Sequence, residues 1–248
     1  MRRTLAVALI VLMSATTVGA AENANDWSHE IGLYGWLAGL KGTIGIGDVA
    51  EQPVEANFDD LAGFVDFAMA LHYEARGAKS LFLADVSYTG LGSERDATVL
   101  QQPVKVKMDL DQWIVELGGG FRVSPKIDVL VVGRYYNMDT GATVISDSGE
   151  DEQGNSVSTG WADIFLGGRY TTTLGTKWFA ALRGDIGVGG SDFAWFGQIS
   201  LGYMFSDKWG TALGYRILDL DYSGNEGVSY LRYDMAQSGL GGSLGCRF

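Results

Sequence analysis

The sequence predicts an all-β fold, an antiparallel up-and-down β-barrel of about ten strands, with eight strands as the alternative. Apolar and polar residues alternate through many segments; over 66–76, for example, the odd positions are apolar and the even ones polar or small. Short turns alternate with longer, acidic connections, which is typical of antiparallel hairpins. The Leu-Gly pairs at Leu117, Leu166 and Leu201 each precede a short turn, and this weak repetition indicates a single domain.

The N-terminal segment has the composition of a secretory signal peptide. Arg2 and Arg3 precede an apolar stretch from Leu5 to Met13, and small residues follow up to Ala21. An uncleaved membrane anchor is the alternative, but the apolar core is shorter than the ~20 residues that a spanning helix needs. We therefore expect residues 1–21 to be a signal peptide and residues 22–248 to form one exported barrel domain.

The expected strands follow one another in order, separated by two kinds of connection. Short turns containing Lys lie at 76–79, 123–126, 174–177 and 206–208. Longer connections are expected at 48–63, 93–102, 139–158, 189–193 and 222–227. Short turns at one end and long loops at the other are typical of a transmembrane barrel. The expected strands are 28–47, 64–76, 80–92, 104–123, 127–138, 159–173, 177–188, 194–206, 208–221 and 228–248.

The polar side of the alternation is rich in Arg and carboxylates, whereas Lys is largely confined to the turns. Guanidinium groups that bridge carboxylates suit a narrow interior, so we assign this polar side to the barrel lumen and the apolar side to lipid. Aromatic residues near both strand ends, including Trp178 at the short turns and Trp36 and Trp161 at the long loops, are expected to form interface girdles. The candidate lumen or constriction residues are Arg134, Arg169, Arg183, Arg216, Glu116, Asp163, Asp185, His72 and Glu74.

Composition excludes several classes of protein. The net charge is −12, which leaves no basic face for a phosphate backbone and argues against nucleic-acid binding. Cys246 is the one cysteine, so neither an intramolecular disulfide nor a cysteine metal cluster is expected. After the signal segment no stretch of 18 residues is continuously apolar, which argues against membrane-spanning helices.

The last strand carries the most specific signal. Leu244, Cys246 and Phe248 share one side of the alternation, and the chain ends on the aromatic residue. In this the sequence resembles the bacterial outer-membrane β-barrel superfamily, as a small barrel of the OmpA/OmpX kind or a porin-like relative. The resemblance implies a location in the outer membrane of a Gram-negative bacterium, among lipid and lipopolysaccharide. It also implies that the barrel-assembly machinery recognises Phe248, Cys246 and Leu244.

Three functions fit these features. The first, which we favour from the sequence, is a narrow passive pore for small solutes, lined by the Arg and carboxylate network. The second is a plugged barrel with a structural or surface-interaction role of the adhesion type, because the interior of a small barrel can be filled by side chains. The least favoured is an outer-membrane hydrolase: His29 and His72 are the two histidines, and no Gly-x-Ser-x-Gly elbow is predicted, because the glycine-rich stretches are interpreted as strand curvature.

No residue is therefore assigned a catalytic, cofactor or metal role. The acidic connections are a partial exception, because their carboxylates are the ligands that Ca²⁺ or Mg²⁺ takes. Their spacing departs from an EF-hand, and a run of charge is also typical of a solvated loop. They comprise Asp147, Glu150, Asp151 and Glu152 in one connection and Asp48, Glu51, Glu55, Asp59 and Asp60 in the other.

Overall fold

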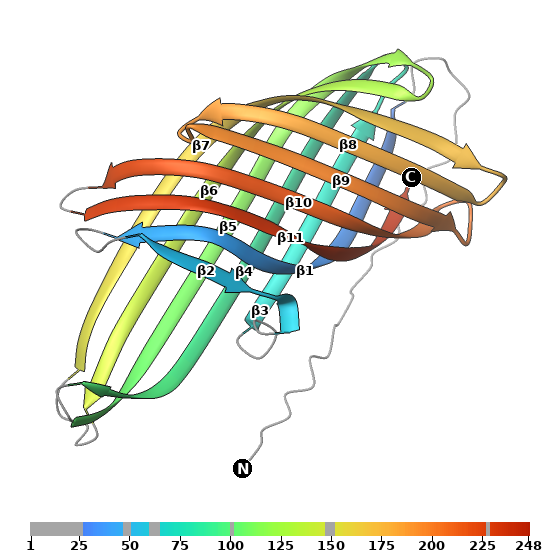
Figure 1. Ribbon diagram of the computed structural model, residues 1–248. Helices are drawn as coiled ribbons and strands as arrows, with labels where there is room; N and C mark the ends of the chain where they lie inside the picture. The colour runs from blue at the N-terminus through green and yellow to red at the C-terminus, as the bar shows by residue number, and fades with distance from the viewer. Residues whose placement is uncertain (1–26, 47–50, 60–64, 100–101, 147–151, 227–228) are drawn as a thin grey trace.

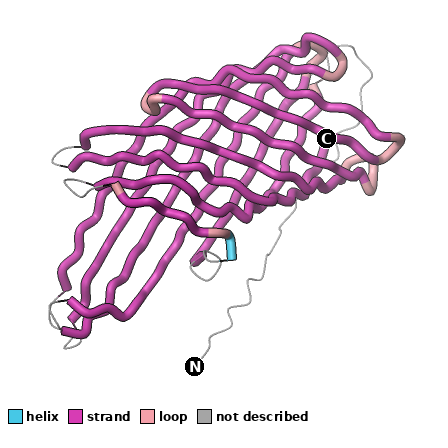
Figure 2. The backbone as a smooth tube through the Cα atoms, viewed as in Figure 1, coloured by secondary structure: helices cyan, strands magenta, loops and turns pink. Residues whose placement is uncertain are grey.

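A computed structural model describes residues 27–46, 51–59, 65–99, 102–146, 152–226 and 229–248. The expected signal peptide lies outside these ranges, as do Asp48, Asp60, Asp147, Glu150 and Asp151 of the acidic connections. Figure 2 shows strand along nearly the whole described path, with turns at the two ends of the molecule.

Ten antiparallel strands form a closed barrel, as the alternation predicts (Figure 1). Each barrel strand pairs with the next along the chain, and β11 pairs with β1 to close the sheet. The short β2 is an additional strand beside β1. The strands are β1 (Ser28–Ile46), β2 (Gln52–Ala56), β3 (Val65–Arg76), β4 (Ser80–Val99), β5 (Gln102–Ser124), β6 (Ile127–Ser146), β7 (Glu152–Leu174), β8 (Trp178–Gly189), β9 (Phe193–Met204), β10 (Trp209–Glu226) and β11 (Ser229–Arg247).

The wall changes partner along β1. Its first part pairs with β3 as far as Tyr34, opposite Ala70, and a later part pairs with β2 from Leu40 to Ile44. The chain passes very close at the junction, since a Cβ on Gly39 would lie 2.9 Å from the carbonyl oxygen of Ala56. Glycine is thus required there by the close approach of two backbones.

Several connections that the sequence predicts as long loops are paired strands instead. β4 and β5 pair from Ser80 to Val99, and β6 and β7 continue pairing to Ile145 opposite Glu152. β5 and β7 have 23 residues each, whereas about 9–11 tilted residues cross a bilayer. The predicted loops at 93–102, 139–158 and 222–227 are therefore mostly extensions of the barrel wall. Because these segments are polar, they resemble loops in the sequence although the strands continue through them.

The two faces of the wall differ sharply in exposure. Along β6, Val129 and Val131 are 38% and 54% exposed, while Leu130 and Val132 between them are 0% and 1% exposed. The outward residues form an apolar belt of the kind that faces lipid. Among the described residues, no helix has the length and apolar character needed to cross a membrane. Other members of the belt are Leu117, Ile164, Leu166, Leu182, Ile186, Val188, Leu213, Leu240 and Leu244.

Two of the predicted girdle residues face the wrong way for that role. Trp161 is 5% exposed and stacks on Tyr222 inside the barrel, with ring centroids 4.1 Å apart. Trp36 packs against the same interior cluster. Both were expected at the lipid interface because aromatic residues near strand ends are common there. Trp178, by contrast, is 47% exposed, on the outward side of β8.

The interior is less polar than the sequence predicts. Leu83, Leu130, Phe165, Leu218 and Leu220 are all 0% exposed and belong to one apolar cluster inside the barrel. A barrel of this size is narrow enough for inward side chains to meet across it, so apolar packing stabilises the interior as it would a core. Continuous apolar runs such as Val129–Val132 indicate an apolar interior, because both sides of the alternation are apolar there.

Candidate functional site

All nine predicted lumen residues lie on inward-facing positions of the wall, but they form separate groups. The first group joins β5, β6 and β8. Arg134 is 1% exposed, and its guanidinium hydrogen bonds and pairs with Glu116 on the neighbouring strand. Arg183 pairs with the same carboxylate at 2.9 Å and with Asp185 at 2.7 Å. Two guanidinium groups and two carboxylates therefore neutralise one another inside the barrel.

Aromatic rings cover this first group. The guanidinium carbon of Arg134 lies 4.3 Å from the ring centroid of Phe165. Phe196 is 3% exposed, and its ring centroid lies 5.0 Å from the guanidinium carbons of Arg134, Arg183 and Arg216. Such contacts favour cations on the ring face and exclude water from around the charges. Sequence reasoning missed Phe196, which reads as an ordinary strand residue.

A second group lies on β3, β6 and β7. Arg169 donates to Glu74 at 2.6 Å and to Asp128 at 3.0 Å, and so connects β7 with β3 across the interior. Arg76 pairs with Glu74 and lies 3.2 Å from Asp128. Asp128 is not among the predicted lumen residues, because it is only the second residue of β6, next to the short turn, where a charge is also typical of the exposed end of a strand.

Asp163 faces inward but does not pair with an arginine within the described chain. Its carboxylate accepts hydrogen bonds from the backbone N–H of Ser191 at 2.8 Å and from the Ser191 hydroxyl at 2.7 Å. The indole of Trp161 also donates to that hydroxyl, at 2.9 Å. Asp163 thus anchors the β8–β9 connection to the wall, which is a structural arrangement.

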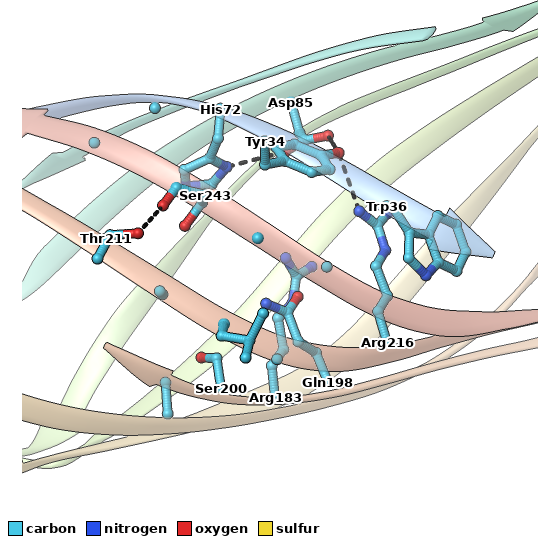
Figure 3. A pocket seen from close by; sticks show the side chains of 18 of the residues that line it. Tyr34, Trp36, His72, Asp85, Arg183, Gln198, Ser200, Thr211, Arg216 and Ser243 are labelled. Carbon is cyan, nitrogen blue, oxygen red and sulfur yellow. Dashed lines mark hydrogen bonds and ion pairs between the residues drawn. The ribbon is translucent and has the colours of Figure 1, made fainter. Parts of the chain in front are cut away.

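A third group forms a hydrogen-bonded chain between β10, β1, β4 and β3 (Figure 3). Arg216 donates to the Tyr34 hydroxyl at 3.0 Å, and that hydroxyl donates to Asp85 at 2.6 Å. The imidazole of His72 lies 3.1 Å from the other Asp85 oxygen, and its second nitrogen is 4.0 Å from Glu74. His72 is therefore held between two carboxylates in the lumen.

A cavity of about 270 Å³ lies beside these groups. Small residues on β10 and β11, among them Ala212, Gly214 and Ser243, leave room for it. Lys208 and Arg247 line the same cavity and lie at the short turns, where both are exposed. Lys208 directly precedes β10, and Arg216 lies eight positions further on, about 27 Å along the tilted strand at ~3.4 Å per residue, so the cavity reaches deep into the barrel.

The residues predicted for assembly lie together at the closing strand pair. Leu244 is exposed on the outward side of β11, and Cys246 is a free thiol two positions further on. The Phe248 ring stacks on His29, with centroids 5.6 Å apart and an angle of 20° between the planes. Within the described ranges, no three His, Cys, Asp or Glu side chains are grouped as metal ligands.

Solved structures of outer-membrane proteins are similar to this chain over most of its length, at low sequence identity. The attachment invasion locus protein Ail of Yersinia pestis is 10% identical, with a TM-score of 0.36 over 90% of this chain and 97% of its own. The outer-membrane protease OmpT of Escherichia coli is 9% identical, with a TM-score of 0.44 over 94% and 99%. The toluene transporter TodX of P. putida is 10% identical, with a TM-score of 0.31 over 89% of each chain. No protein-family model and no curated protein sequence matches this chain.

The closed ten-strand sheet and the continuous outward apolar belt define the class of the molecule. It is an antiparallel up-and-down β-barrel whose outward apolar belt is typical of a transmembrane barrel.

Proposed function

We propose that the protein is a plugged outer-membrane barrel with a structural or surface-interaction role, and that its interior does not serve as an open passage. The observation that carries this proposal is the burial of the lumen cross-section, where Phe165, Leu83 and Leu218 are 0% exposed. Arg134, the largest of the fully buried side chains, fills the adjoining space at 1% exposure. Packed side chains of this kind leave little room for hydrated solutes.

The shape of the wall supports a role at the outer surface. β4 to β7 have 20–23 residues each, whereas β8 and β9 have 12 each. The longer strands continue as a hydrogen-bonded sheet past the length that crosses a bilayer. A sheet of this kind presents a fixed surface to a partner, because paired strands lose less conformational entropy on binding than free loops do.

A narrow pore remains the second candidate, and the charged cavity at the short-turn end favours it. In that case the pairs of Arg134 and Arg183 with Glu116 would form the constriction. Opening would require the apolar cluster around Phe165 to move aside. The two functions therefore differ in a measurable quantity, the ion current through a folded barrel.

The decisive experiment is single-channel recording of the refolded mature chain in planar bilayers. We expect the wild type to show no steps and Phe165→Ala combined with Leu218→Ala to conduct, because the double substitution removes two large side chains from the plug. Ile164→Ala, which truncates an outward side chain that is 68% exposed, serves as the matched silent control. Steps in the wild type that change ion selectivity in Arg134→Ala, Arg183→Ala would overturn the plugged barrel and establish the pore.

A further inference from the structure

We propose that the cavity at the short-turn end is a binding site for a small organic anion, in which Arg216 binds a carboxylate and neighbouring aromatic rings contact the apolar body. This inference goes beyond the plugged barrel, because it gives the inner end of the molecule a ligand of its own. The site is a pocket closed at its deep end by Phe196, Ile114 and Arg134, which line it and are almost fully buried.

The charge of the lining favours an anion. Six cationic side chains and three carboxylates line the cavity, although the whole chain carries a net charge of −12. Four of these cations are already neutralised by ion pairs: Arg134, Arg169 and Arg183 inside the barrel, and Arg247, which pairs with Glu30, at the mouth. Lys208 lies at the mouth, where its exposed ammonium group would attract an anion from solution.

Arg216 is the cation with spare capacity. Among the described residues no carboxylate lies within ion-pair distance of it, and the hydrogen bond to Tyr34 uses one of its five N–H donors. Its Nε is buried and has no hydrogen-bond partner. An unmet donor on a buried guanidinium is costly, and a ligand carboxylate is the group that meets two such donors at once.

The surroundings of Arg216 select for an apolar body on the ligand. Its guanidinium carbon lies 4.6 Å from the centroid of the Trp36 ring, which is beside it in Figure 3. It lies 5.0 Å from the ring centroid of Phe196. Gln198 and Ser200 line the cavity next to these groups and supply further hydrogen-bonding positions. A bare, strongly hydrated ion gains nothing from the aromatic rings, whereas an aromatic carboxylate uses both the charge and the rings.

Titration calorimetry of the refolded barrel in detergent tests the site, with benzoate as the probe and benzyl alcohol and inorganic phosphate as its neutral and hydrophilic counterparts. We expect benzoate to bind saturably and at least about tenfold more tightly than either counterpart, because the charge-assisted bond and the ring contacts act together. Arg216→Gln should weaken benzoate binding at least about tenfold. Arg232→Gln, which removes an arginine that pairs with Asp221 outside the cavity, should leave it unchanged.

A second variant keeps the inference testable if Arg216→Gln fails to fold. Ala212→Leu fills part of the cavity without changing its charge, and it should also weaken benzoate binding. Equal binding of benzoate and benzyl alcohol, binding of phosphate alone, or full benzoate affinity in Ala212→Leu would each overturn the proposal. The outcome is separable from that of the plugged barrel, because calorimetry on folded protein reports binding whether or not the lumen conducts.

Discussion

At the scale of single residues, the interior is governed by charges that are removed from water together with their partners. Arg134 is 1% exposed, and Glu116 is shared between it and Arg183. A buried pair of this kind adds little net stability relative to apolar packing, but loss of one member leaves a charge without its partner. Loss of one member of an exposed ion pair at the rim of the barrel has little effect on stability, because water replaces the lost partner.

We therefore expect Arg134→Gln to lower the free energy of unfolding by about 3–5 kcal/mol. Arg247→Gln should lower it by less than about 1 kcal/mol, because Arg247 and Glu30 form an ion pair whose side chains are 53% and 44% exposed. Urea unfolding in lipid vesicles measures both changes. The double variant Arg134→Gln, Glu116→Gln should recover part of the loss, and a strictly additive double variant would contradict the pairing.

The outward face follows a different rule, set by depth in the bilayer. Val131 is 54% exposed on the outward side of β6, away from both ends of its strand. We expect Val131→Arg to cost about 2–4 kcal/mol in the same unfolding assay. Val123, 62% exposed and next to the short turn after β5, should tolerate Arg at about 0–1 kcal/mol. Equal costs at the two positions would contradict the placement of the apolar belt.

At the scale of elements, the β4–β5 hairpin separates the part of the wall that crosses the membrane from the part that extends beyond it. Arg95 pairs with Val106, and Glu94 pairs with Lys107 one step nearer the membrane. Replacement of residues 95–106 by Asn-Gly joins that pair with a two-residue hairpin turn. We expect the trimmed barrel to refold with a free energy of unfolding within about 1 kcal/mol of wild type, because the removed segment lies beyond the length of strand that crosses a bilayer.

Heat-modifiable migration on gels and urea unfolding would check this trimmed variant. Loss of the folded band would contradict the prediction, because it would place the extension within the cooperative folding unit. If the trimmed barrel folds but whole cells that carry it no longer bind the partner of the wild-type protein, the interaction surface lies on the extension. The control is a second trimmed barrel, in which the same Asn-Gly turn is placed beyond Tyr222 in the β10–β11 hairpin while β4 and β5 stay intact.

The elements also mark how far the sequence could predict the fold. Membrane-crossing strands such as β3 carry clear alternation, and their positions agree with the prediction to within a few residues except at the long-loop ends. The β6 extension carries small and polar residues on both sides, so residues 139–146 resemble a loop. Trp36 and Trp161 were assigned to the wrong face because alternation cannot distinguish lipid from a packed interior when both are apolar.

The candidate site was predictable to a similar degree. Arg134, Arg183 and Glu116 are isolated charges within apolar strands, and that contrast alone places them on the inward side. Which arginine meets which carboxylate depends on pairing across the lumen, as in the contact of Arg169 with Glu74 between β7 and β3. Such contacts leave no periodic signal. The cavity depends on Gly214 and Ser243 being small on neighbouring strands, which requires the register of β10 and β11.

At the scale of the whole molecule, closure of the barrel depends on the pairing of its first and last strands. β1 and β11 pair from Glu30, opposite Arg247, to Ile46, opposite Leu231. At the end of this pairing the backbones of His29 and Phe248 exchange two hydrogen bonds, at 2.9 and 2.8 Å. The final residue thus has two separable features, a backbone that completes the sheet and a ring that stacks on His29.

Phe248→Ala keeps the backbone pair and removes the ring, whereas deletion of Phe248 removes both. If the ring is a signal for the assembly machinery, Phe248→Ala should reduce the outer-membrane yield in cells several-fold while lowering the free energy of unfolding in vitro by only about 1 kcal/mol. Deletion should reduce both quantities further, because the carbonyl and N–H of His29 lose their partners. Leu174→Ala, which truncates an outward residue that is 48% exposed at another short turn, is the matched control. A residue that the assembly machinery recognises affects assembly in cells beyond its effect on the stability of the folded barrel. If the yield falls only in proportion to the measured stability, the role of Phe248 is therefore limited to closing the barrel.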